Sequence, residues 1–238
     1  MYVVAIIPAR MNSSRFYGKP LKKIKDIPMI GHCYFRAKMS KYLNETYVAT
    51  CDNEISDYVK KIGGTAIMTS KKHQRASDRT AEAMKKIEKK INRKIDIVVM
   101  IQGDEPMITP EMINKAILPF KKNKKINVVN LMTKIRTIKE AKDPNEVKVV
   151  VDKESNAVYF SRESIPSNKK INKKNTYYKQ VCIMPFRRNA LINFNNLQET
   201  KLEKIESVDM LRFIENNVKV HMVLVNEETY SVDTPKDL

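Results

Sequence analysis

Long hydrophobic runs and paired cysteines are both missing from this chain. No apolar stretch in its 238 residues approaches the roughly 20 residues that a membrane-spanning helix needs. The first ten residues, MYVVAIIPAR, have neither a positively charged start nor a small-residue cleavage site, so we do not expect a signal peptide. The three cysteines, Cys33, Cys51 and Cys182, are scattered and form no C-x-x-C pair, which argues against a disulfide scaffold and a zinc finger. These absences predict a cytoplasmic protein without a membrane segment.

Acidic residues are few relative to basic ones. The chain has 45 Lys and Arg against 27 Asp and Glu, a formal net charge of +18. Such an excess is typical of proteins that bind nucleic acid or another polyanion. Here the basic residues are spread along the whole chain, and no nucleic-acid recognition motif accompanies them. A solvated basic surface and a preference for anionic ligands both stay open; a polyanion-binding protein is a distant alternative, and nucleic acid is not expected as a partner.

Apolar, β-branched runs alternate with helical periods in the first half of the chain. They predict strands, the first and last buried on both faces, at residues 3–7, 47–50, 66–69 and 97–101. Between them, apolar residues recur at helical spacing, and Gly63 ends one such helix. Thr109 and Pro110 predict the start of another, as an N-cap followed by proline at the first helical position. This alternation predicts an α/β fold with a mostly parallel sheet covered by helices on both faces.

The second half predicts more strands than helices. Strand-like runs lie at 128–132, 147–151, 158–160, 181–186 and 220–225. Helical spacing is found only around Val208 and Leu211. The polar stretch between Ser164 and Thr176 is too hydrophilic to pack, and we interpret it as a mobile loop. Since no repeat and no interdomain linker is present, we expect a single domain over residues 1–238.

A basic loop follows the first predicted strand. The segment from Pro8 to Pro20 carries Arg10, Arg15 and Lys19 at the edge of the sheet where ligands bind in open α/β folds. Arginine binds phosphate oxygens with two nitrogens and lysine supplies a compact charge, a combination that suits a triphosphate. The pattern GxxxxGK[ST] is absent, so this is not a Walker loop. An ordinary basic surface loop is the alternative interpretation.

Two acidic residues are predicted at the same edge. Asp104 follows the strand at 97–101 within QGDEP, and Asp233 follows the last predicted strand within VDTP. A carboxylate that faces a triphosphate is either repelled by it or bridged to it by a divalent cation. Mg²⁺ held by one or two carboxylates and by phosphate oxygens is the usual arrangement. The alternative for both residues is a turn-forming aspartate near a proline.

Taken together and in this order, these segments resemble the 3-deoxy-manno-octulosonate (Kdo) cytidylyltransferase family. The likeness runs over almost the whole chain. It is carried by IIPAR with SSR and GKPL, MTSKKHQRASDRTAEA, QGDEPMI, NEVKVVVD, VYFSRESIP, LEKIESVDMLR and VDTPKDL.

The resemblance implies a fold and a reaction. The expected fold is the three-layer α/β/α nucleotide-diphospho-sugar transferase type, with a smaller lobe at roughly 134–210 for sugar binding and dimerisation. The expected reaction is CTP + Kdo → CMP-Kdo + pyrophosphate, which activates the sugar acid for lipopolysaccharide or capsule synthesis. The expected cofactor is Mg²⁺, the partners are CTP and the sugar acid, and the assembly is a homodimer.

The resemblance also implies roles for individual residues. The catalytic residues would be Arg10, Lys19, Asp104 and Asp233, of which the first two neutralise the triphosphate and the aspartates hold Mg²⁺. The nucleotide site would further include Pro8, Ala9, Arg15, Ser77, Arg79 and Gln102. The sugar site would include Gln102, Arg162, Gln180 and Glu206.

Three places depart from the family pattern, one of them the usual LPGKP, which is FYGKP at residues 16–20 of this chain. Where the family has HxGxYxYR, this chain has QVCIMPFR, so that the histidine aligns with Gln180 and the glycine with Cys182. Where the family has SGT before the acidic–Arg pair, this chain has Arg75, Ala76 and Ser77. Because the segment QVCIMPFR belongs to the sugar pocket in the family, 8-amino-Kdo or another 2-keto-3-deoxy sugar acid stays open as the acceptor. On the residues alone, Ser77 is also a candidate helix N-cap.

Overall fold

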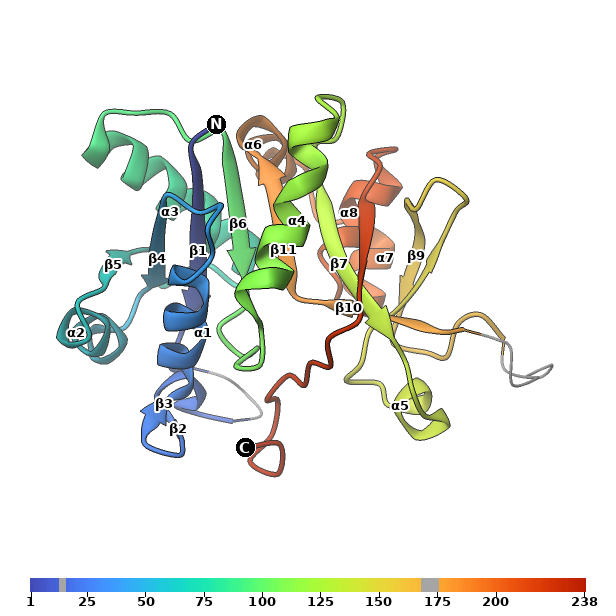
Figure 1. Ribbon diagram of the computed structural model, residues 1–238, viewed down its shortest axis with the longest axis horizontal. Helices are drawn as coiled ribbons and strands as arrows, with labels where there is room; N and C mark the ends of the chain where they lie inside the picture. The colour runs from blue at the N-terminus through green and yellow to red at the C-terminus, as the bar shows by residue number, and fades with distance from the viewer. Residues whose placement is uncertain (13–15, 168–175) are drawn as a thin grey trace.

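The computed structural model describes residues 1–12, 16–167 and 176–238. It contains two five-stranded sheets that lie side by side between layers of helices (Figure 1). Arg15 and most of the predicted 164–176 loop lie outside the described residues. In the described part of the chain, no helix combines the length and the apolar character needed to cross a lipid bilayer.

The first sheet contains the four strands expected in the N-terminal half. Its order is β11-β6-β1-β4-β5, and all neighbours are parallel except β11, which runs antiparallel to β6 at the edge. The strands are β1 (Val3–Ala9), β4 (Glu45–Thr50), β5 (Thr65–Met68), β6 (Ile97–Ile101) and β11 (Ile183–Arg187). β1 is buried along its whole length, as its unbroken apolar run predicts.

The second sheet is mixed. Its order is β12-β7-β10-β8-β9; β12 and β7 are parallel, and the other neighbours are antiparallel. The strands are β7 (Val129–Lys134), β8 (Lys148–Val151), β9 (Ala157–Ser161), β10 (Tyr178–Val181) and β12 (His221–Val225). Residues 134–210 supply β8, β9 and β10, whereas β7 and β12 come almost wholly from outside that range. That this range forms a separate lobe stays a prediction.

The prediction of one strand over residues 181–186 is wrong. The chain leaves the second sheet after β10 and enters the first sheet as β11, with Cys182 at the crossing point. The carbonyl of Cys182 accepts a hydrogen bond from the amide of Gln102 at 3.1 Å. Since the residues on both sides of Cys182 are buried and apolar, no change in hydropathy marks the switch.

Helices cover both faces of the sheets, which confirms the three-layer α/β/α fold. On β1, Val3, Ala5 and Ile7 pack with one set of helices, while Val4 and Ile6 pack with the other. The first set is α1 (Met29–Lys38), α2 (Asn53–Lys61) and α4 (Pro110–Lys122). The second is α3 (Ala76–Ile91), α6 (Arg188–Asn196) and α8 (Met210–Glu215). The short elements are the turn η1 (Lys19–Leu21), the hairpin β2 (Lys23–Ile24) and β3 (Ile27–Pro28), α5 (Ile138–Lys142) and α7 (Lys201–Glu206).

Candidate active site

A cavity of about 680 Å³ opens at the edge where the parallel strands of the first sheet end. Both halves of the chain contribute to its walls. The predicted site residues that line it are Pro8, Ala9, Arg10, Lys19, Arg79, Gln102, Asp104 and Arg162. The fold therefore brings most of the predicted nucleotide site to one place, with Arg162 from the second sheet facing it.

Two glycines let the loops of this edge approach one another. A Cβ on Gly103 would lie 3.2 Å from the carbonyl oxygen of Pro8, so the loop after β6 packs directly on the end of β1. Gly18 adopts the left-handed conformation, with φ +71°, which favours glycine. Its amide donates to the carbonyl of Met11 at 2.9 Å, and this folded-back loop presents Lys19 to the cavity.

Lys19 lies between the two predicted acidic residues. Its Nζ is 2.8 Å from Asp104 Oδ2 and 3.6 Å from Asp233 Oδ1. The amide of Val232 donates to the carbonyl of Asp104 at 2.9 Å, which holds the C-terminal segment against the loop after β6. Asp233 itself lines the neighbouring cavity. The structure thus places both aspartates around one ammonium group at the sheet edge.

The donor set around Asp104 fits a divalent cation. Asp104 Oδ1 is buried and has no hydrogen-bond partner within the described part of the chain. A buried carboxylate oxygen without a donor is costly unless a cation or a ligand occupies its lone pairs. Among the described residues, no group of three or more His, Cys, Asp or Glu side chains forms a metal cage. Asp104 and Asp233 supply two carboxylates at this edge, and Mg²⁺ is usually bound by one or two carboxylates together with phosphate oxygens and water.

Glu105, next to Asp104, contributes little charge at neutral pH. It is only 4% exposed. Burial, and after it the charge of Asp104, raises the pKa of Glu105 to about 8. Its carboxyl group is therefore mostly protonated at pH 7. The negative charge of this edge is carried by Asp104 and Asp233.

Arg79 lines the cavity and has a side-chain donor that is left without a partner among the described residues. The residue stands in the first turn of α3, is 3% exposed and lines the cavity. Its NH1 donates to Thr69 Oγ1, whereas NH2 is buried and has no partner in the region that the structure describes. A buried guanidinium nitrogen of this kind calls for an acceptor oxygen such as the carbonyl of a base.

Arg162 is held at the opposite wall by backbone carbonyls. Its Nε donates to the carbonyl of Glu206 at 2.7 Å and its NH1 to that of Pro144 at 2.8 Å. The carboxylate of Glu206 accepts from the amide of Arg162 and from Ser161 Oγ, both at 2.8 Å. Glu206 is not among the cavity-lining residues and fixes the end of β9. Its predicted contact with the sugar stays a prediction.

Two further predicted residues are not among those that line the cavity. Ser77 is fully buried and donates to Asp209 Oδ2 at 2.8 Å. It is not the N-cap of α3, because the helix begins at Ala76 and Arg75 occupies that position. The side chain of Gln180 donates to Asn130 Oδ1 in the second sheet. The ligand contacts predicted for Ser77 and Gln180 stay predictions, as does that of Arg15, which lies outside the described residues.

Sequence reasoning assigned no role to five polar residues of the cavity wall. They are His73, Gln74, Arg75, Asn145 and Ser207. Arg75 had a signal, since it replaces the serine of the family pattern. Asn145 and Ser207 lie in NEVKVVVD and LEKIESVDMLR, two segments that carry the resemblance, but their residue types alone do not indicate a ligand site.

Known proteins share this architecture along the full chain. A family model described as cytidylyltransferase matches residues 4–227. The 3-deoxy-manno-octulosonate cytidylyltransferase of Thermodesulfovibrio yellowstonii is 41% identical over 245 residues, which cover 100% of this chain and 96% of the relative. That of Fusobacterium nucleatum subsp. nucleatum is 42% identical over 238 residues, 100% of this chain and 94% of the relative. The solved structure of CMP:2-keto-3-deoxy-manno-octonic acid synthetase complexed with CTP is 37% identical, with a TM-score of 0.90 over 99% of this chain and 95% of its own.

Proposed function

Since the chain belongs to the cytidylyltransferase family, we propose that it transfers the cytidylyl group of CTP to 3-deoxy-manno-octulosonate and releases pyrophosphate. The observation that carries this proposal is the single cavity that holds Arg10, Lys19 and Asp104 at the carboxyl ends of β1 and β6. Relatives named for this reaction are 41% and 42% identical along the whole chain, which supports the same substrates.

In this reaction a hydroxyl oxygen of the sugar acid attacks the α-phosphorus of CTP. The bond from that phosphorus to the oxygen of the leaving pyrophosphate breaks, and the hydroxyl proton passes to solvent. Arg10 and Lys19 offset the charge of the triphosphate. Asp104 and Asp233 would hold Mg²⁺, which supplies further neutralisation at the phosphates and lowers the pKa of a bound hydroxyl.

The two walls of the cavity suit the two substrates. On the nucleotide side, the unpartnered NH2 of Arg79 would donate to an oxygen of the cytosine ring. On the other side, Arg162 presents a guanidinium that is already oriented by carbonyls of Glu206 and Pro144. A fixed guanidinium suits the carboxylate of a sugar acid, because arginine pairs with carboxylates through two parallel hydrogen bonds.

The acceptor has one alternative, motivated by the chain's own residues. Gln180 and Cys182 replace the histidine and glycine of the family pattern. These changes favour testing 8-amino-Kdo and other 2-keto-3-deoxy sugar acids beside Kdo. With Kdo as acceptor, the product would enter lipopolysaccharide or capsule synthesis. We include in the proposal the lobe at roughly 134–210 and a homodimer, for which light scattering would give twice the 27.6 kDa of one chain.

The test is pyrophosphate release from each of the four common nucleoside triphosphates, with Mg²⁺ or with EDTA. Each is combined with Kdo, with 8-amino-Kdo or with no acceptor. An Asp104→Ala variant runs alongside, and Asp57→Ala, an exposed aspartate on α2, serves as the matched control. Release that requires CTP, Kdo and Mg²⁺, and that is lost only in the Asp104 variant, supports the proposal. Folded protein that binds no CTP would overturn it, and release only with another acid would replace the acceptor.

A further inference from the structure

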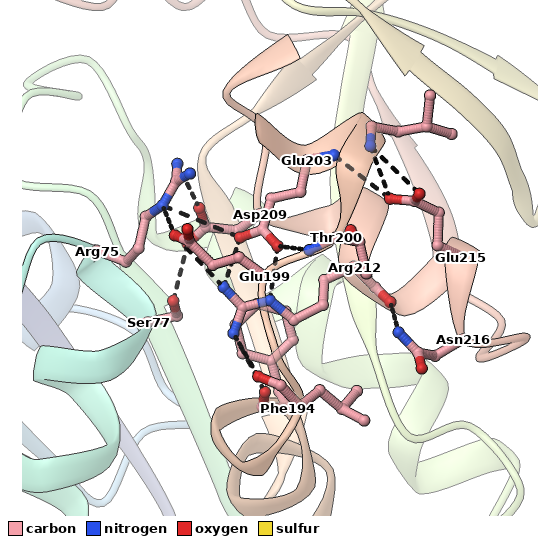
Figure 2. Close-up of polar contacts among 12 residues, drawn as sticks. Arg75, Ser77, Phe194, Glu199, Thr200, Glu203, Asp209, Arg212, Glu215 and Asn216 are labelled. Atoms are coloured by element: carbon pink, nitrogen blue, oxygen red, sulfur yellow. Dashed lines mark hydrogen bonds and ion pairs between the residues drawn. The ribbon is translucent and has the colours of Figure 1, made fainter. Parts of the chain in front are cut away.

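Five charged side chains form a cluster between the start of α3 and the segment that contains α7 and α8 (Figure 2). Two are arginines, one at the N-cap of α3 and one on α8. Three are carboxylates from the segment that contains α7. The cluster consists of Arg75, Arg212, Glu199, Glu203 and Asp209.

Arg75 makes the connection from the nucleotide side. Its Nε donates to Glu199 Oε1 at 3.0 Å and its NH1 to Asp209 Oδ1 at 3.4 Å. These contacts span 124 and 134 residues of sequence. Two residues further on, Ser77 donates to the other oxygen of Asp209. The start of α3 is therefore attached to the second half of the chain at two points.

The third carboxylate of the cluster, Glu203, lies 3.9 Å from Arg75 Nε and is held from behind. Arg212 binds Glu203 with two hydrogen bonds, Nε to Oε2 at 2.7 Å and NH2 to Oε1 at 2.6 Å. Its guanidinium also lies 4.2 Å from the ring centre of Phe194. Glu203 is fully buried, and its Oε2 also accepts from the amide of Thr200 at 3.2 Å at the start of α7. Since such a buried bidentate pair has little freedom to move, it is a rigid anchor for α7 and α8.

The C-terminal end of α7 contacts Arg162. α7 ends at Glu206, and Ser207 follows in the left-handed conformation, with φ 53°. The carbonyl of Glu206 accepts from Arg162 Nε and its carboxylate from the amide of Arg162. Ser207 lines the cavity together with Arg75 and Arg162. A continuous series of contacts thus runs from the start of α3 through α7 to the guanidinium that faces the sugar side.

We propose that Arg75 is a positioning residue for the sugar acid: by joining the start of α3 to Glu199 and Asp209, it fixes the segment that orients Arg162. This inference rests on the proposed function. Without Arg75, the cluster keeps Arg212 and the hydroxyl of Ser77, which donates to Asp209. The mutual repulsion of the three carboxylates then loosens the contact between α3 and the Asp209 segment. The nucleotide contacts of Arg10 and Lys19 come from other parts of the wall. Arg79 follows Arg75 in the first turn of α3, but Thr69 on the loop after β5 also holds its guanidinium.

The test compares Arg75→Ser with Arg188→Ser. Serine is the residue of the family pattern at position 75, so the fold accommodates it. Arg188 is the matched control, because it too forms an ion pair that involves α3. It binds Glu88 of that helix through two hydrogen bonds of 2.6 and 3.0 Å, and its side chain is about as exposed as that of Arg75. The Arg188–Glu88 pair lies near the C-terminal end of α3, at the opposite end from Arg75. Arg75→Lys, which keeps the charge but has one nitrogen for two partners, tests rescue.

We expect Arg75→Ser to raise the KM for the sugar acid about ten-fold while the calorimetric Kd for CTP changes less than about two-fold. The lysine variant should fall between serine and wild type. Arg188→Ser should leave both constants near wild type, even where its melting temperature is lower. An unchanged sugar KM in Arg75→Ser, an equal rise in the CTP Kd, or the same rise in Arg188→Ser would each overturn the inference alone. Wild-type protein that releases no pyrophosphate would overturn the proposed function and this inference with it.

Discussion

Lys19 and Asp104 form an ion pair across 85 residues of sequence, with Nζ 2.8 Å from Oδ2. The pair joins the loop after β1 to the loop after β6, and it lies within the cavity wall. In the absence of substrate each group neutralises the other. A triphosphate competes with Asp104 for the ammonium group of Lys19, because both offer anionic oxygens. Substrate and cation binding are therefore expected to be linked through this pair.

Asp104→Asn separates the contact of Asp104 with Lys19 from its ability to hold a cation. The amide has nearly the same shape and can still accept from Lys19, but it has lost the charge that would hold a divalent cation. We expect turnover to fall about 100-fold or more. In EDTA, CTP should bind the variant at least as tightly as the wild type, because a negative charge near the triphosphate has been removed. Steady-state pyrophosphate release and calorimetry with CTP give the two values.

Asp57→Asn is the control for that experiment. Asp57 is an exposed aspartate on α2 that pairs only at the surface, with Lys60 at 3.6 Å. Its replacement should change neither value, since exposed pairs contribute little. Wild-type turnover by Asp104→Asn would contradict a catalytic role for the carboxylate.

Arg79→Lys tests how the base is recognised. Lysine keeps the positive charge but cannot both donate to Thr69 and supply the buried second nitrogen. We expect the KM for CTP to rise about ten-fold, with a smaller change in kcat, because the lost contact is made to bound substrate before the reaction. Titration with CTP and with UTP measures the change and the loss of base selectivity. Arg93→Lys, an exposed position that lies over the ring of Tyr2, is the control, and an equal effect there would count against Arg79.

Elements whose signal is local were predicted from the sequence. Thr109 caps α4 as expected, and its Oγ1 accepts from the amide of Met112 at 3.2 Å. In contrast, α7 was missed because its only buried residue is a glutamate, Glu203, so that no apolar stripe marks it. The switch between sheets at Cys182 was missed because both flanking strands are apolar.

In the candidate site, too, the positions of some residues were predicted from the sequence, while the contacts of other side chains were not. Asp104 and Lys19 lie at one edge of the first sheet as predicted, because each belongs to a loop that follows the carboxyl end of a parallel strand. The direction of a side chain depends on partners far along the chain, which hydropathy does not reveal. Ser77 turns to Asp209 and Glu206 turns to Ser161, partners 132 and 45 residues away.

Lys148→Met tests a buried ammonium group that supports the sugar side of the cavity. Lys148 is fully buried, and its Nζ donates to the carbonyls of Asp143 and Glu146, both at 2.8 Å, and to that of Arg162. Burial lowers its pKa, but the carbonyls and nearby carboxylates hold it in place. Methionine would leave three carbonyls without this donor, so we expect the free energy of unfolding to fall by about 2–4 kcal/mol.

Urea denaturation measures that loss, with Lys219→Met as the control. Lys219 is 71% exposed and pairs with Glu154 at the surface, so its removal should cost less than about 1 kcal/mol. Because Lys148 holds the carbonyl of Arg162, the folded variant should also show a higher KM for the sugar acid. Equal stability of the two variants would show that the buried contacts are not stabilising.

The pKa of Glu82 leads to a prediction of how the free energy of unfolding changes as the pH falls. Burial alone would raise its pKa, but hydrogen bonds from Lys86, the amide of Ser70 and His73 outweigh it and lower the pKa of Glu82 from 4.5 to about 2. A carboxyl whose pKa is lower in the folded state stabilises fully above the unfolded value and loses this contribution as the pH falls through the folded one. The stability advantage of the wild type over Glu82→Gln should therefore be constant above about pH 5 and shrink by about 3 kcal/mol on going to pH 2. Urea denaturation at a series of pH values measures it, and Glu54→Gln, an exposed glutamate on α2, should run parallel to the wild type. An advantage for Glu82 that is the same at every pH would mean that its carboxylate is not held by these three donors.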